Sequence, residues 1–153
     1  YTITVTHKNT FANGGQAYTL LVSGAGGTAY CPSVPVQTGG ARIDSVSFQS
    51  IHFLNPASAT VKYSDNTNLT ASIEPMQTVP IYVKTGSSDG TNVTRYVKVF
   101  IDFNGNGSFA DPGEMVAVST GLVNGGALNT NISIPDNVIV GNLYLMRIVV
   151  EET

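Results

Sequence analysis

The sequence predicts an all-β protein, an antiparallel β-sandwich of Greek-key or jelly-roll type. Short runs of alternating polar and apolar residues recur along the chain, and glycine, asparagine and proline separate them. No window sustains the apolar period of a helix with good helix formers. Many short strands with turn residues between them are typical of two packed antiparallel sheets.

The first part of the chain predicts a β-hairpin that is separate from the main domain. Residues 2–6 alternate polar and apolar side chains, and residues 18–23 form a second short apolar run after an Asn-Gly-Gly turn. The glycine-rich stretch that follows is typical of a linker. We therefore expect a hairpin remnant over 1–24, a linker over 25–29 and the β-sandwich over 30–153.

The remaining strands are expected at intervals over the rest of the chain. Pro80 lies inside one of them and favours an edge position, because proline has no N–H for the ladder. The strongest prediction is 96–103, which ends by delivering Asp102 into a polar loop. The predicted strands cover residues 42–48, 51–54, 60–63, 79–83, 96–103, 115–118, 131–134 and 143–150.

Composition limits the classes of function. Apolar residues make up 42% of the 153 residues, which is typical of one globular domain. Charged residues make up 11%, less than half the usual share of about 25%. The net charge is −3 and no basic run occurs, so we expect no nucleic-acid partner. No apolar stretch approaches the roughly 18 residues of a membrane span. We expect a monomer.

Residues 102–114 have the pattern of a calcium loop. Oxygen-bearing side chains stand at positions one, three and five, glycine stands at position six, and two more carboxylates follow. Ca²⁺ needs six to eight oxygen ligands, and Gly107 permits the sharp turn around it. Three carboxylates so close together would repel one another without a cation. The predicted ligands are Asp102, Asn104, Asn106, the main-chain carbonyl of Ser108, and Asp111, Glu114 or both.

The final ligand and the ion itself remain open at this point. In an EF-hand the bidentate Glu stands at position twelve, but here that position is Gly113, and Glu114 follows at thirteen. A bound Na⁺ is one alternative, and an Asn/Gly-rich hairpin with solvated acids is another. Mg²⁺ fits poorly because it prefers a rigid octahedron and keeps its waters.

No catalytic constellation occurs in the sequence. His7 and His52 are the only histidines, and neither a His-Glu-x-x-His nor a Gly-x-Ser-x-Gly motif is present. We expect His52 to face solvent, and we expect Asp44 and Asp65 to make hydrogen bonds within turns. Cys31 is the single cysteine, which excludes an internal disulfide. The chain is therefore expected not to be an enzyme.

Residues from about 30 to 150 resemble the GEVED domain family of secreted bacterial proteins. Family members usually run on to a Gly-Glu-rich closing segment, whereas this chain ends at Thr153. The resemblance implies a β-sandwich with the loop as its metal site. It rests on Tyr30-Cys31-Pro32-Ser33, on Ile43 to Val46, on Tyr63-Ser64-Asp65 with Thr67, and on Val99 to Glu114.

Residues 1–24 are similar to the closing hairpin of the β-domain that follows the catalytic domain in some secreted subtilisin-like peptidases. This resemblance implies a fragment of a secreted bacterial serine peptidase. The fragment is then a non-catalytic, calcium-stabilised accessory module that helps bind protein substrate or a cell-surface component, or that stabilises the parent enzyme. An alternative is a carbohydrate-binding or adhesive module of a bacterial surface protein, with tyrosines as a glycan platform, although the chain has no Trp.

Overall fold

The computed structural model describes residue 30 and residues 40–55, 63–123 and 125–152. Within these ranges the chain forms seven strands and no helix. The predicted hairpin, the linker, His7 and Cys31 lie outside the described residues. The strands are β1 (Ala41–Phe48), β2 (Ile51–Leu54), β3 (Thr78–Ser87), β4 (Arg95–Ile101), β5 (Met115–Val118), β6 (Ala127–Ser133) and β7 (Met146–Glu152).

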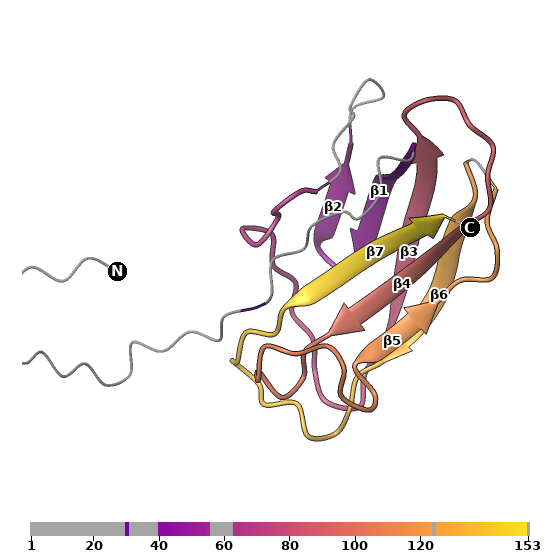
Figure 1. Cartoon of the computed structure of the whole chain (residues 1–153). Helices are drawn as coiled ribbons and strands as arrows, with labels where there is room; N and C mark the ends of the chain where they lie inside the picture. The colour runs from indigo at the N-terminus through magenta and orange to yellow at the C-terminus, as the bar shows by residue number, and fades with distance from the viewer. Residues whose placement is uncertain (1–29, 31–39, 56–62, 124, 153) are drawn as a thin grey trace, which may run out of the picture.

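The strands form two antiparallel sheets, which confirms the all-β prediction. One sheet has the order β2-β1-β3-β6 and the other has the order β5-β4-β7. Figure 1 shows the three-stranded sheet lying across the four-stranded one. Buried apolar side chains from both sheets join in one core. Its members are Val46, Phe48, Val79, Ile81, Val83, Val97, Val99, Ile101, Phe103, Leu128, Ile132, Ile134 and Val138.

Alternation along β3 and β4 builds the centre of this core. Throughout β4, and in β3 as far as Thr85, the odd-numbered residues are buried, while the even-numbered ones are exposed or half-buried. Successive side chains of a strand point to opposite faces, so a period of two places one apolar row between the sheets. Each fully buried valine or isoleucine contributes about 1.5–3 kcal/mol. The strand predicted from residue 96 is β4, the central strand of the three-stranded sheet.

The expectation that Pro80 marks an edge strand is wrong, because β3 lies between β1 and β6. The N–H of Thr85 donates to Gly126 O, on the β6 side of β3. Alternate residues of a strand turn their N–H to opposite sides, so the nitrogen of Pro80 faces the β1 side. There β1 has already ended at Phe48, which pairs with Ile81. The missing N–H therefore removes no bond from the ladder.

Some strand limits also differ from the prediction. Tyr63 belongs to no strand, and the rest of the predicted strand 60–63 lies outside the described residues. Strand β6 begins at Ala127 rather than at residue 131, because polar Asn129 and Asn131 pair with β3 as the outward-facing row. Strand β7 begins only at Met146, because the residues before it pack on the loop that follows β4.

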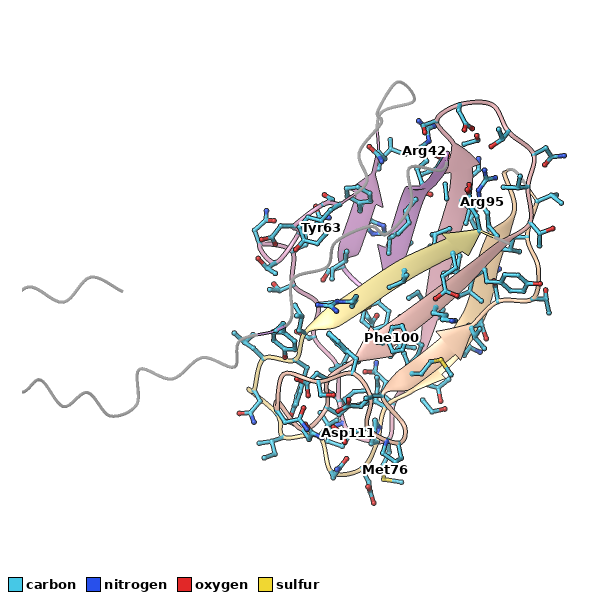
Figure 2. All side chains as sticks on the ribbon, viewed as in Figure 1. Arg42, Tyr63, Met76, Arg95, Phe100 and Asp111 are labelled. Atoms are coloured by element: carbon cyan, nitrogen blue, oxygen red, sulfur yellow. The ribbon has the colours of Figure 1, made fainter. Side chains whose placement is uncertain are left out.

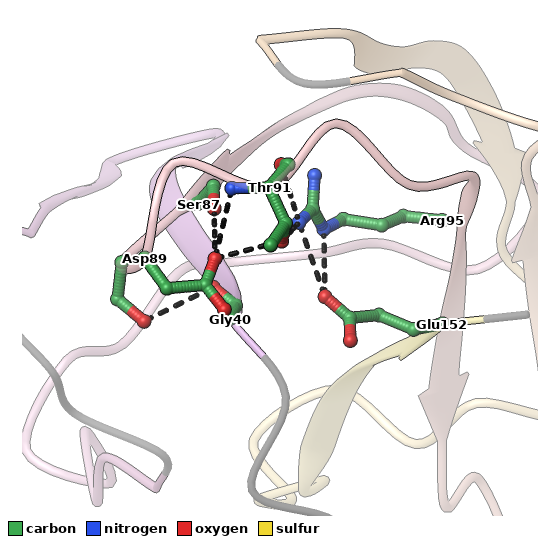
Figure 3. A network of polar contacts seen from close by, with 7 residues as sticks. Gly40, Ser87, Asp89, Thr91, Arg95 and Glu152 are labelled. Atoms are coloured by element: carbon green, nitrogen blue, oxygen red, sulfur yellow. Dashed lines mark hydrogen bonds and ion pairs between the residues drawn. The ribbon is translucent and has the colours of Figure 1, made fainter.

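A polar network ties strands together at one end of the molecule (Figure 3). Arg95 is fully buried in β4 and pairs with Glu152 of β7, with 3.1 Å between Nη2 and Oε1. The same guanidinium donates to the carbonyl of Thr91. Nearby, the carboxylate of Asp89 accepts hydrogen bonds from the hydroxyls of Ser87 and Thr91. Across the described part of the chain there is no helix long and apolar enough to cross a membrane.

Candidate functional site

The loop 102–114 joins β4 to β5 at the end of the molecule opposite to Arg95. Figure 2 shows Asp111 at this end, with Arg42 and Arg95 at the other. The N–H of Ile101 donates to Glu114 O over 2.9 Å, which closes the base of the loop. The N–H of Asp102 donates to Leu145 O over 3.1 Å, which ties the loop to the segment before β7. The loop is therefore anchored to β4 and to the segment that precedes β7.

Asp102 is fully buried and organises the loop from inside. Its Oδ1 accepts the backbone N–H groups of Gly105 and Asn106, and its Oδ2 accepts the N–H of Gly107 and the hydroxyl of Tyr30. Burial raises its pKa, but these four donors outweigh burial and hold the pKa below its usual range. The four donors occupy the roughly four lone-pair sites of the carboxylate. A cation that reaches Asp102 must displace one of them.

Tight turns shape the middle of the loop. Asn104 Oδ1 accepts the N–H of Asn106, and Asn106 Oδ1 accepts the N–H of Ser108. Each bond runs from an Asn side chain to the backbone two residues on, which is an Asx turn. Gly107 adopts a φ of 83°, the left-handed conformation expected at position six. The oxygens of this segment thus bend the chain as well as offering lone pairs.

Asp111 accepts hydrogen bonds from two side-chain amides of the loop. Its Oδ2 accepts a hydrogen bond from Asn104 Nδ2 over 3.1 Å and one from Asn106 Nδ2 over 2.7 Å. Neutral amide donors only partly compensate a carboxylate charge. The loop therefore holds a half-buried anion next to the buried Glu114.

Glu114 is the unusual residue of the site. Its side chain is only 3% exposed, and both carboxylate oxygens are buried without a hydrogen-bond partner. Burial raises its pKa, and the charges of Asp102 and Asp111 raise it further; the backbone N–H groups of Asp111 and Asn104 lower it in part without reaching hydrogen-bond geometry. A buried carboxylate normally has paired oxygens, because an unpaired one costs several kcal/mol. Neither carboxylate oxygen of Glu114 therefore accepts a hydrogen bond among the described residues.

A cavity of about 320 Å³ brings part of the predicted ligand set together. Asn104, Asp111 and Glu114 line it, whereas Asp102, Asn106 and Ser108 do not. Within the described ranges, no three histidine, cysteine, aspartate or glutamate side chains gather as a metal-holding group. A cation here needs amide or main-chain oxygens beside its carboxylates, which is the oxygen-rich set that Ca²⁺ accepts. The buried, unpaired Glu114 and this donor chemistry fit such an ion.

Sequence reasoning missed two contacts of the loop. Tyr30 donates its hydroxyl to Asp102 over 2.7 Å and stacks on Phe109, with ring centroids 5.4 Å apart. Burial and the neighbouring negative charge raise the pKa of Tyr30 to about 12. Asn137 lines the same cavity as Glu114, from the connection between β6 and β7. Tyr30 stood out only as the first residue of a motif that resembles the GEVED family. Nothing in the sequence pattern pointed to Asn137.

The other candidate residues have structural roles. His52 is exposed on β2, and its Nδ1 lies 3.3 Å from Ser47 Oγ, as expected for a solvent-facing residue. Asp65 accepts the N–H and the hydroxyl of Thr67, so the predicted turn bond is confirmed. Asp44 instead forms an ion pair with Arg42, with 2.6 Å between Oδ1 and Nε.

Residues 96–153 match the model of the GEVED domain family. The match contains β4, the loop 102–114 and the three later strands, and it supports the resemblance over that part of the chain. Residues 30–95 lie outside the match. A GEVED domain is an accessory type of domain and not a known catalytic family. No curated protein and no solved structure matches the chain.

Proposed function

We propose that the chain is a non-catalytic accessory β-sandwich module, stabilised by Ca²⁺ bound in the loop 102–114. The buried carboxylate of Glu114, which has no partner, carries this proposal. A divalent cation beside it offsets the repulsion from Asp102 and Asp111 and supplies the missing partner. Both Asp111 and Glu114 then act as ligands, with Asn104 on the same cavity. The further proposed ligands are Asp102, Asn106 and the carbonyl of Ser108.

The ion is expected to be structural. Extracellular calcium modules bind with dissociation constants of about 10⁻⁴–10⁻³ M. At about 1 mM calcium such a site adds about 0.4–1.4 kcal/mol to the free energy of unfolding. Three backbone N–H groups already donate hydrogen bonds to the carboxylate of Asp102 and so bend the loop without the ion. The ion therefore completes a largely formed loop and has no chemical step to perform.

Isothermal titration with CaCl₂ and, separately, with MgCl₂ tests this proposal. We expect one calcium site per chain and much weaker magnesium binding. Glu114→Gln should abolish calcium binding, because it removes the buried charge at nearly constant volume. Glu74→Gln is the matched control, since Glu74 is exposed and does not line the cavity. Absence of calcium binding by the unaltered protein would contradict the proposal.

We further propose that the module belongs to a secreted bacterial peptidase and assists binding of protein substrate or of the cell surface. The support is the resemblance of residues 1–24 to a peptidase β-domain, together with the accessory type of the matched family. The gene region that encodes residues before Tyr1 tests this proposal. A subtilisin-type Asp/His/Ser domain there supports it, and a repeat array without such a domain contradicts it.

A carbohydrate-binding or adhesive module is the second candidate. Tyr63 is 57% exposed and lines a cavity together with the polar segment 64–67 and with Tyr144. An exposed aromatic ring beside hydroxyl, amide and carboxylate groups is a suitable contact surface for a sugar. A glycan array with the unaltered protein and Tyr63→Ala tests it. Binding that depends on Tyr63 supports this candidate, and absence of any bound glycan contradicts it.

A further inference from the structure

The cavity beside Glu114 has walls from two parts of the fold. Asn104, Asp111 and Glu114 come from the loop between β4 and β5 of the three-stranded sheet. Pro135 and Asn137 come from the connection that leaves β6 of the four-stranded sheet. Figure 1 shows both segments at the same end of the molecule. A ligand in this cavity therefore contacts both layers.

The loop side alone does not complete a calcium shell in this cavity. Asn104, Asp111 and Glu114 provide three oxygen-bearing side chains there, whereas Ca²⁺ takes six to eight oxygens. Asn137 is exposed, and its amide makes no hydrogen bond to the described residues. A side-chain amide oxygen is an ordinary calcium ligand. Asn137 thus offers a side-chain oxygen on the cavity that the buried carboxylate of Glu114 also lines.

The connection is already held against the loop beside this cavity. The rings of Phe103 and Tyr144 lie with centroids 6.1 Å apart, and the hydroxyl of Tyr144 accepts the N–H of Ile139 over 2.8 Å. The N–H of Asp102 donates to Leu145 O. These contacts fix residues 139–145 of the connection against the loop, on the C-terminal side of Asn137.

We propose that Asn137 is a calcium ligand and that the ion clamps the connection between β6 and β7 onto the loop 102–114. This inference rests on the proposed calcium site and extends it to the second sheet. Calcium then acts as a cross-link between the two layers as well as a support for one loop. Its binding should slow amide hydrogen exchange over residues 135–145 as well as in the loop.

Calcium titration of two charge variants tests the clamp. Asn137→Asp adds a carboxylate to the shell, so its calcium affinity should rise at least about fivefold, because ligand charge sets the affinity of such sites. Asn142→Asp is the matched control on the same connection. It makes the same charge change at an exposed residue that does not line this cavity. Asn137→Ala should bind calcium about tenfold more weakly than the unaltered protein.

The outcomes separate the two proposals. Calcium binding that is equal in the Asn137→Asp and Asn142→Asp variants overturns the clamp but leaves the calcium loop intact. If calcium still slows amide hydrogen exchange in the loop 102–114 of Asn137→Ala, but no longer over residues 135–145, that result supports the clamp. Absence of calcium binding in the unaltered protein overturns the calcium loop and the clamp together.

Discussion

Glu114 is the residue on which the account depends most. Its two oxygens are buried without a hydrogen-bond partner, and burial together with the charges of Asp102 and Asp111 raises its pKa. The sequence pattern singled the residue out as a possible last ligand, alone, together with Asp111 or not at all. Burial could not be read from the pattern, because Glu114 precedes β5 and a charged residue there is usually solvated. In the folded chain Glu114 lines a cavity whose wall also includes Pro135 and Asn137 of the connection before β7.

The first prediction concerns Glu114→Gln without metal. In EDTA at neutral pH this variant should unfold at a higher temperature than the unaltered protein, because it removes a buried charge that lacks a partner. A carboxyl group whose pKa is raised by folding costs stability when ionised, and this cost disappears as pH falls toward its usual value. Thermal unfolding from pH 7 down to about 4.5 should show the difference shrinking. A destabilised variant in EDTA would contradict this reading.

The second prediction concerns the hydroxyl of Tyr30. Tyr30→Phe keeps the ring on Phe109 but removes the donor to the buried Asp102 carboxylate. A hydrogen bond to a charged group is worth about 1.5–3 kcal/mol, and the half-buried position favours the lower value. Urea unfolding should therefore show a loss of about 1.5 kcal/mol. Tyr82→Phe, at an exposed tyrosine of β3, is the control and should cost much less. Equal effects would contradict the role of Tyr30.

At the scale of elements, β7 is held to β4 by two ion pairs of different burial. Arg95 is fully buried and faces Glu152, whereas Lys98 and Glu151 pair on the exposed face with 2.7 Å between Nζ and Oε2. One more atom of the buried guanidinium, Nη1, has no hydrogen-bond partner among the described residues. Arg95 therefore depends strongly on Glu152 for compensation of its charge.

The third prediction compares the neighbouring glutamates. Glu152→Ala should cost about 3 kcal/mol or more, because it leaves the buried Arg95 charge without its carboxylate. Glu151→Ala should cost less than about 1 kcal/mol, since its pair is exposed and screened. Chemical unfolding of both variants measures the difference. Similar losses would show that Arg95 finds compensation elsewhere.

The fourth prediction concerns pH and the turn after β3. Asp89 accepts hydrogen bonds from the hydroxyl and the N–H of Thr91 and from the hydroxyl of Ser87. These bonds hold its pKa well below the usual range. A carboxylate whose pKa is depressed by folding contributes stability above its unfolded pKa of 3.8, and that contribution is lost as pH falls below it. Asp89→Asn should therefore be less stable than the unaltered protein at neutral pH. The gap should narrow in acid, and a constant gap from pH 6 to about 2 would contradict the assignment.

At the scale of the whole molecule, the sequence predicted what is local and missed what topology assembles. The all-β class, the presence of a strand leading into the polar loop and the turn at Gly107 follow from patterns within a few residues, although β4 ends at Ile101 and not at residue 103 as predicted. Tyr30 reaches the loop from 72 positions away, so no spacing rule could find its bond to Asp102. Pro80 was misread because its meaning depends on where the neighbouring strand ends.

The two ends of the molecule differ in how their buried charges are compensated. Arg95 and Glu152 form an ion pair at one end, between β4 and β7 of the same sheet, while the two carboxylate oxygens of Glu114 at the other end accept no hydrogen bond among the described residues. A calcium ion beside Glu114 would compensate that charge and, through Asn137, would link the loop 102–114 to the connection between β6 and β7.

Thermal unfolding in excess EDTA and again in millimolar CaCl₂ tests this claim most directly, with Glu114→Gln and the control Glu74→Gln measured alongside. Calcium should raise the unfolding temperature of the unaltered protein by a few degrees, as expected for about 1 kcal/mol. Glu74→Gln should respond equally, and Glu114→Gln should not respond. An unaltered protein that unfolds at the same temperature in both solutions would contradict the calcium site.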